Sequence, residues 1–417
     1  MRALSLIVLL SLVAGLAAGA FIRMSGDASL ASTASVIEAF GGLWLNALRM
    51  TVLPLVVSLL ITGIASVADA TKTGGLVARA VMLFTFLIFC AALYGIAATQ
   101  GLLALFPVNP EAAAAFLAGI GADAIPEITE PPSFATWLQS LAPANPFRAA
   151  ADDQILPLVV FAIFFGFAAT RLEPGLRTII VDFFRAVSEA MVVIVRWVLL
   201  AGPLGVFALS IGVGLRAGFG AAETLLHYVV VVAGITLGAT IIAWLIAVTW
   251  GRQPVGRFTS ASVPVWAIAF STQSSLASLP VMLEAAIRNL RIPAHLADVT
   301  LPLAVAVFRF TSPVANLGVC FFIAHLYGLE PSALQIAGAV VVAFAVSVGS
   351  VGLPGQVSFI ASIAPICLAL GVPTELLGIL LAVEVIPDIF RTLGNVTADM
   401  ATTAILSKGE REQAAES

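Results

Sequence analysis

The feature that most constrains this chain is a succession of apolar blocks, each long enough to cross a lipid bilayer. The first block runs from Ala3 to Ile22, and a transmembrane helix needs about 20 predominantly apolar residues. Only 10% of the 417 residues are charged and 60% are hydrophobic, whereas a soluble domain has about 25% charged residues. The sequence therefore predicts an all-α polytopic membrane protein, because a water-soluble fold could not bury so much apolar surface.

The composition also excludes several classes of function. The net charge is −4 and no basic stripe is present, which argues against a nucleic-acid partner. No nucleophile–base pair, phosphate-binding loop or redox motif appears, so we expect neither an enzyme nor a resident cofactor. The three cysteines lie in apolar segments without metal-ligand spacing and are predicted to be buried thiols: Cys90, Cys320 and Cys367.

The first part of the chain carries simple apolar blocks. The opening block resembles a secretory signal, but it is long enough to span the bilayer and is predicted to be a retained helix. The fifth block has charged residues in its first turns and contains Gly202-Pro203, which predicts a kink. The six spans are predicted at 3–22, 41–68, 77–106, 155–171, 185–215 and 224–250.

The second part of the chain carries interrupted blocks. Polar, Gly-rich or Pro-rich breaks at membrane depth cannot face lipid, because their unpaired backbone groups would each cost several kcal/mol. Two broken blocks, each followed by a polar span, are typical of an inverted repeat around a binding site at the bilayer midplane. The blocks are a first hairpin at 258–285, span seven at 295–328, a second hairpin at 334–371 and span eight at 374–406.

Lys and Arg residues predict the orientation, because cytoplasmic loops are enriched in them. With the amino terminus inside, the basic loops after the even-numbered spans also fall inside, and the acidic connection 107–154 falls outside. A full crossing by either hairpin block would misplace the later charges. The pattern therefore favours eight transmembrane helices plus two re-entrant helical hairpins, with both termini cytoplasmic.

Span eight holds the densest ionisable set of the chain. Asp388, Arg391, Asn395 and Asp399 follow one another at steps of three, four and four residues, which places them on one helix face. Ionisable groups within a span usually face a site or a pathway. The stripe suits a small zwitterion or anion that travels with a cation. In the alternative interpretation, Asp388 and Arg391 form one ion pair that only locks helices together.

The run 388–399 resembles the signature of the dicarboxylate/amino acid:cation symporter family, which has the glutamate-transporter fold. Ser274 and Ser275 resemble the serine-rich tip of its first hairpin, and 349–355 resembles its second tip. The resemblance implies a homotrimer in the lipid bilayer, in which a scaffold holds a mobile transport domain.

The resemblance also implies roles for individual residues. Ser274 and Ser275 would bind the main-chain carboxylate of the substrate, Asp388 its amino group and Arg391 its side-chain carboxylate. Thr392 and Asn395 would complete that pocket. The gate would lie in the second tip, at Ser350, Pro354 and Gly355, and a coupling cation would be held by Asn395 and Asp399.

The chain departs from the family pattern where relatives bind sodium. The Asn-Met-Asp-Gly-Thr break of span seven is replaced by 308–313, and cation ligands of span three correspond to Phe84, Leu87 and Ile88. We hypothesise that Arg309, in the broken span, stands in for one sodium ion. The alternatives are that it clamps a second substrate carboxylate or reaches to the membrane interface.

The sequence therefore predicts a symporter for aspartate, glutamate or C4-dicarboxylates in a bacterial inner membrane, with altered or reduced sodium coupling. The alternatives are a proton-coupled or sodium-independent dicarboxylate carrier, or a non-accumulating sensor or anion channel of the same fold. Residues 1–250 would be mainly scaffold, with span three partly in the transport domain. Residues 251–407 would form the transport core, and 408–417 a cytoplasmic tail.

Overall fold

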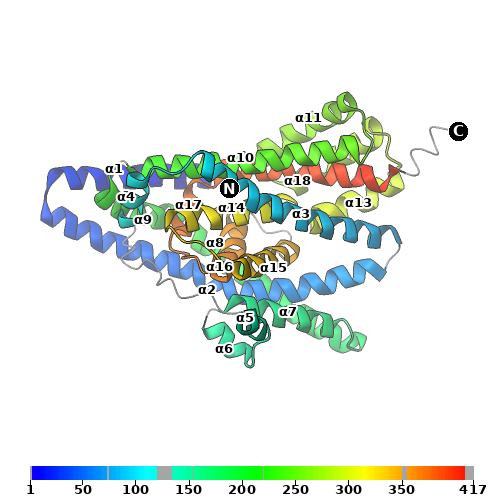
Figure 1. The fold of residues 1–417 in the computed structure, drawn as a ribbon, viewed down its shortest axis with the longest axis horizontal. Coiled ribbons are helices and arrows are strands. Elements are labelled where there is room, and N and C mark those ends of the chain that lie inside the picture. The colour runs from blue at the N-terminus through cyan, green and yellow to red at the C-terminus, as the bar shows by residue number, and fades with distance from the viewer. Residues whose placement is uncertain are drawn as a thin grey trace.

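The structure is a computed structural model, and every regular element in the part that it describes is a helix (Figure 1). The long helices run side by side through one bundle. This confirms the predicted all-α membrane architecture. The residues described are 2–72, 75–119, 134–152, 154–218, 220–349 and 355–408.

The first ten helices follow the predicted spans with two differences. The second and fifth spans begin earlier than expected, at Ala28 and Pro174, because their first turns are helical but too polar for a hydropathy signal. Three short helices, α4 to α6, were not predicted, since each is too short for a clear periodicity. The elements are α1 (Arg2–Ser25), α2 (Ala28–Lys72), α3 (Gly75–Leu105), α4 (Pro110–Gly119), α5 (Phe134–Ser140), α6 (Pro146–Ala151), α7 (Ile155–Ala169), α8 (Pro174–Leu200), α9 (Gly202–Ala217) and α10 (Gly220–Thr249).

The second half is a series of broken pairs, and the polar interruptions predicted all of these breaks except the last, at Glu384. A single π-helical turn, Ala285–Asn289, ends the first hairpin. The pairs are α11 (Val255–Thr272) with α12 (Ser275–Glu284), α13 (Ala294–Val307) with α14 (Thr311–Leu326), α15 (Ala333–Gly349) with α16 (Gly355–Leu370), and α17 (Leu377–Val383) with α18 (Val385–Leu406).

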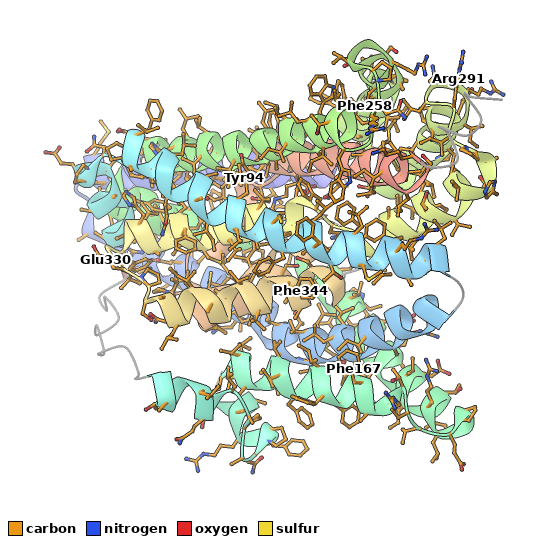
Figure 2. The ribbon with its side chains drawn as sticks, turned by 45° about the vertical axis from the view of Figure 1, so that its right-hand side comes forward. Tyr94, Phe167, Phe258, Arg291, Glu330 and Phe344 are labelled. Atoms are coloured by element: carbon orange, nitrogen blue, oxygen red, sulfur yellow. The ribbon has the colours of Figure 1, made fainter. Side chains whose placement is uncertain are left out.

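Several helices meet the length and hydropathy of a membrane span. Among the described residues there are five such helices, or six if α8 and α9 count as one span bent by 59°. That bend lies at Gly202-Pro203 and confirms the predicted kink. α7 is short, with 15 residues, and α18 carries three charged residues along its polar face. Apolar side chains such as Phe167 stand on the outside of the bundle, as expected of a surface that faces lipid (Figure 2).

Close helix contacts fix the first half of the bundle. At Gly214 of α9, an added Cβ would lie 2.3 Å from the backbone oxygen of Leu16 on α1. Only a residue without a side chain allows the two backbones to approach so closely.

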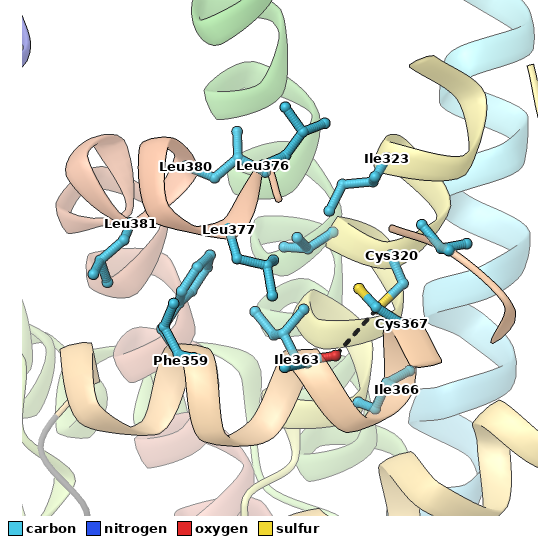
Figure 3. Packing of buried hydrophobic residues seen from close by; sticks show 14 of the residues in the cluster. Cys320, Ile323, Phe359, Ile363, Ile366, Cys367, Leu376, Leu377, Leu380 and Leu381 are labelled. Carbon is cyan, nitrogen blue, oxygen red and sulfur yellow. Dashed lines mark hydrogen bonds between the residues drawn. The ribbon is translucent and has the colours of Figure 1, made fainter. Parts of the chain in front are cut away.

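The core around α14, α16 and α17 is densely packed and apolar (Figure 3). Cys320 and Cys367 are free thiols in this core, with their Sγ atoms 3.3 Å apart. Both side chains are fully buried, which confirms the prediction made for these two cysteines. Cys90 is only partly buried, so the prediction was too strong for that residue.

Candidate substrate and cation site

The site is built on α18, which packs against α10 and lies just below it in Figure 1. The helix brings its polar residues to one face, as their spacing predicts. Asp399 and Thr392 are buried, whereas Asp388, Arg391 and Asn395 are partly buried. This polar face is directed into the protein and not toward lipid.

The break in span seven lies directly against α18. α13 ends at Val307, Phe308 is extended, and α14 begins at Thr311. The Thr311 backbone N–H donates to Asn395 Oδ1 at 2.9 Å, and its hydroxyl donates to the Arg391 carbonyl oxygen at 2.9 Å. These bonds satisfy polar groups that a broken helix would otherwise leave unpaired inside the membrane. The polar break therefore belongs to the same site as the stripe on α18.

Gly394 makes this contact possible. A Cβ at this position would lie 2.4 Å from Thr311 Cγ2 and 2.9 Å from Thr240 Oγ1 on α10. Any side chain would push α18 away from α14, and the hydrogen bonds of Thr311 would be lost.

Arg391 is held by partners from two other helical segments. Its Nη2 lies 2.7 Å from Glu384 Oε1 in an ion pair, and its Nη1 donates to Asn316 Oδ1 at 3.0 Å. The side chains of Arg391 and Glu384 are only 13% and 5% exposed. The second oxygen of Glu384 accepts a hydrogen bond of 2.7 Å from the hydroxyl of Tyr228 on α10. The ion pair of Arg391 is therefore with Glu384, and not with Asp388 as in the alternative interpretation of the sequence.

Asp399 is a fully buried carboxylate at the carboxyl-terminal end of the stripe. Its exposure is 0%, and neither oxygen has a hydrogen-bond partner among the described residues. Arg309, in the break of span seven, is the charged group that acts on it electrostatically. Arg309 also interacts with Asp388 and is repelled by Arg391. The hypothesised neighbourhood of Arg309, Asp388 and Asp399 is thus present.

Aromatic rings occupy the region where the sequence predicts that the oxygen ligands of a sodium site are absent. Phe84 of α3 stacks on Phe308 with ring centroids 4.6 Å apart, and Phe310 lies 5.9 Å from Phe308. Leu87 and Ile88 are buried in the same apolar cluster. These five side chains offer no oxygen atom to a cation. No group of three or more His, Cys, Asp or Glu residues that could bind a metal occurs in the described part of the chain.

The tip of the first hairpin reaches the start of α18. Gln273 ends α11 in a left-handed conformation with φ of 52°, and its Nε2 donates to the Val385 carbonyl oxygen at 3.5 Å. Ser274 is the N-cap of α12, and its Oγ accepts a hydrogen bond from the Ala277 N–H at 3.2 Å. Ser275 follows as the first residue of α12. The N-terminus of α12 suits an anion, because the backbone N–H groups of a first helical turn point outward.

The remaining residues of the predicted pocket are placed less completely. Thr392 donates its hydroxyl to the carbonyl oxygen of Asp388, one turn earlier, at 2.9 Å. In the second hairpin, Gly355 is the first residue of α16. Ser350 and Pro354 lie outside the described residues.

Sequence reasoning missed two side chains of the site and the role of a third. Tyr228 and Asn316 lie in long apolar helices, and nothing in the sequence assigns them to Arg391. Glu384 lies in predicted span eight, but the sequence analysis gives it no role. The spacing of seven residues between Glu384 and Arg391, two helical turns, was a usable signal.

The chain matches the model of one protein family, described as "Sodium:dicarboxylate symporter family", over residues 4–409. It is 26% identical to the "Proton/glutamate-aspartate symporter" of Escherichia coli (strain K12), an alignment that covers 97% of this chain and 92% of the relative. It is 25% identical to the "Proton/sodium-glutamate symport protein" of Bacillus caldotenax, covering 90% and 88%. It is also 30% identical to "Neutral amino acid transporter A" of Homo sapiens, covering 99% and 84%.

Proposed function

The chain belongs to the sodium:dicarboxylate symporter family, and on that premise we propose that it moves acidic amino acids or C4-dicarboxylates across a bacterial inner membrane. The observation that carries this proposal is the buried guanidinium of Arg391 in the middle of a polar stripe. A planar guanidinium matches the geometry of a carboxylate and binds it with two parallel hydrogen bonds. Two relatives with glutamate in their names support the same substrate class.

In this proposal each part of the substrate has a partner. Ser274, Ser275 and the start of α12 bind the main-chain carboxylate, and Asp388 accepts from the ammonium group. Arg391 binds the side-chain carboxylate, with Thr392 and Asn395 beside it. The second hairpin closes over the bound substrate.

The coupling ion is proposed to differ from that of sodium-dependent relatives. Asp399 and Asn395 remain as cation ligands, but the guanidinium of Arg309 supplies a fixed positive charge next to Asp399. The rings of Phe84 and Phe308 close off the space on the other side of the break. Uptake therefore depends weakly on sodium or not at all, and protons or fewer sodium ions drive it.

We further propose a homotrimer that works by an elevator mechanism. Residues 251–407 would move as the transport core against a scaffold formed mainly by 1–250. The first hairpin, α13 and α18 share one buried apolar cluster, which supports their movement as a unit.

A second candidate function is the transport of neutral amino acids. Its support is the ion pair with Glu384, which neutralises Arg391 in the described structure. A human relative with this name is 30% identical to the chain.

Uptake by the purified protein in liposomes tests these functions. Radiolabelled aspartate, succinate and alanine are offered under an imposed sodium gradient, a proton gradient or neither. Accumulation of aspartate or succinate supports the proposal, and accumulation of alanine alone supports the second candidate. Equilibration without accumulation under every gradient would indicate a channel, and binding without any flux would indicate a sensor.

A further inference from the structure

We propose that Glu384 is a built-in competitor for the substrate carboxylate on Arg391, and that a proton taken up by Glu384 releases Arg391 to an acidic substrate. This inference rests on the proposed function, because it requires Arg391 to be the residue that binds a substrate carboxylate.

Both terminal nitrogens of Arg391 already face a protein oxygen, whereas its Nε has no hydrogen-bond partner among the described residues. Nη2 faces Glu384 Oε1 at 2.7 Å, and Nη1 donates to Asn316 Oδ1 at 3.0 Å. A substrate carboxylate that binds this guanidinium with two hydrogen bonds must use at least one terminal nitrogen, and at Nη2 it competes with the carboxylate of Glu384 and is repelled by it. Glu384 is only 5% exposed, so it cannot simply turn into water. A buried carboxylate left without its partner is strongly unfavourable.

The charges around the site make a proton the natural companion of the substrate. Two guanidinium groups face three carboxylates: Arg309 and Arg391 against Glu384, Asp388 and Asp399. The site is therefore formally anionic before any substrate arrives. An acidic amino acid adds one further negative charge to a region of low dielectric. One proton on Glu384 returns the total to its starting value.

Among the described residues, the groups that act on Glu384 come from two helices. Arg391 and Asp388 on α18 act on it, and Tyr228 on α10 donates a hydrogen bond to it. Cys320 of α14 is a titratable neighbour of Tyr228. α1, α9 and α16 also pack against α17, and no charged group from their described residues acts on Glu384.

Protonation at one oxygen breaks the ion pair without disturbing the other oxygen. A proton from water forms an O–H bond at Oε1 of Glu384, and no covalent bond breaks. This O–H then faces Nη2 of Arg391, so a donor meets a donor and the attraction between them is lost. Oε2 still accepts from Tyr228 at 2.7 Å, which keeps the neutral side chain in place. Arg391 is left free to bind the substrate.

The test measures binding of aspartate and succinate to the purified full-length protein by calorimetry between about pH 5 and pH 9. In the wild type, affinity falls tenfold per pH unit above the pH at which Glu384 loses its proton, because only the protonated fraction is competent. Glu384→Gln is expected to bind the substrate equally well at every pH, with the affinity that the wild type has at low pH. Binding to the wild type at high pH takes up about one proton per substrate, and binding to Glu384→Gln takes up none.

A matched control is Glu375→Gln. Glu375 is a glutamate just before α17 that is ion-paired to Arg49 at 2.9 Å, but it is 47% exposed and outside the site. This variant is expected to keep the pH profile of the wild type. Tyr228→Phe gives a second variant. It removes the hydrogen bond to the charged carboxylate, and the loss of affinity should then begin at a higher pH.

The outcomes separate the inference from the proposed function. If Glu384→Gln keeps the pH profile of the wild type, the inference is overturned. It is also overturned if the loss of affinity in Tyr228→Phe begins at the same pH as in the wild type. Loss of binding by a folded Glu384→Gln also overturns it, because Glu384 would then position Arg391 and not compete for it. In each of these cases the wild type still binds acidic substrates, so the proposed function stands. Binding of alanine but of no acidic substrate at any pH would refute the proposed function and the inference together.

Discussion

If transport is independent of sodium, as proposed, replacing Arg309 with methionine should make it depend on sodium. Methionine keeps the length of the side chain but removes the only charge known to act on Asp399 in the described part of the chain. Asp399 would remain fully buried, with no hydrogen bond from a described residue to either oxygen. A small cation is the simplest replacement for the lost guanidinium.

The size of the effect follows from the burial of the pair. Removing one partner of a buried ion pair costs about 3–5 kcal/mol, which corresponds to about two to three and a half powers of ten in an equilibrium constant. A sodium ion that binds the folded variant at about 100 times its dissociation constant restores about 2.7 kcal/mol. Most of the loss at Arg309→Met should therefore be recovered in high sodium.

The assay compares thermal unfolding midpoints and aspartate affinity in sodium chloride and in choline chloride at equal ionic strength. The wild type should give the same values in both salts, and Arg309→Met should be less stable in choline and respond to sodium. The double variant Arg309→Met/Asp399→Asn should lose the sodium response, because both charges have been removed. A wild type whose affinity rises steeply with sodium, or an Arg309→Met protein that is indifferent to sodium and fully stable, would refute the argument.

Two further variants test the site and the packing. Arg391→Ala removes the proposed carboxylate partner and leaves Glu384 buried without its counter-charge, so acidic-substrate affinity measured by calorimetry should fall more than tenfold, about 1.4 kcal/mol or more. Gly214→Ala forces a Cβ to within 2.3 Å of the Leu16 backbone oxygen and should destabilise the protein by about 1–3 kcal/mol in a denaturation assay. Gly42→Ala is its control, because an added Cβ on α2 meets nothing within 4 Å and should be neutral or stabilising by up to about 1 kcal/mol.

The positions of the long helices could be predicted from the sequence because the bilayer leaves few alternatives. A span must be long, apolar and helical, and a polar break must be buried. The break at 308–310 and the kink at Gly202 follow directly from these constraints. The short helices α4 to α6 do not span a membrane, so no such constraint reveals them. The same holds for the polar first turns of α2 and α8.

The site was predictable only where its residues share a helix. The spacing of Asp388, Arg391 and Asp399 predicts one face of α18, and the structure has it so. Contacts between helices depend on packing that one sequence does not reveal, and the hydrogen bond from Tyr228 to Glu384 spans 156 residues of sequence. Glu384 itself precedes the first residue of α18, where a short break separates α17 from α18. Spacing alone therefore favours the nearer Asp388 as the partner of Arg391.

Arg309 and Glu384 have different consequences for energy coupling. Arg309 is proposed to replace a bound sodium ion, whereas Glu384 is proposed to take up a proton from solution. A guanidinium that is part of the chain balances Asp399 in every state, but it never dissociates and so carries no energy from an ion gradient. If Arg309 has taken the place of one sodium ion, the coupling that this ion provided is lost unless another group exchanges an ion with water. Glu384 can do this, because the ion pair with Arg391 opposes its protonation and the arrival of the substrate carboxylate favours it. A proton gradient alone should therefore drive accumulation of an acidic substrate in liposomes, and Glu384→Gln should still bind that substrate but only equilibrate it. Accumulation by Glu384→Gln under a proton gradient would show that the proton binds elsewhere.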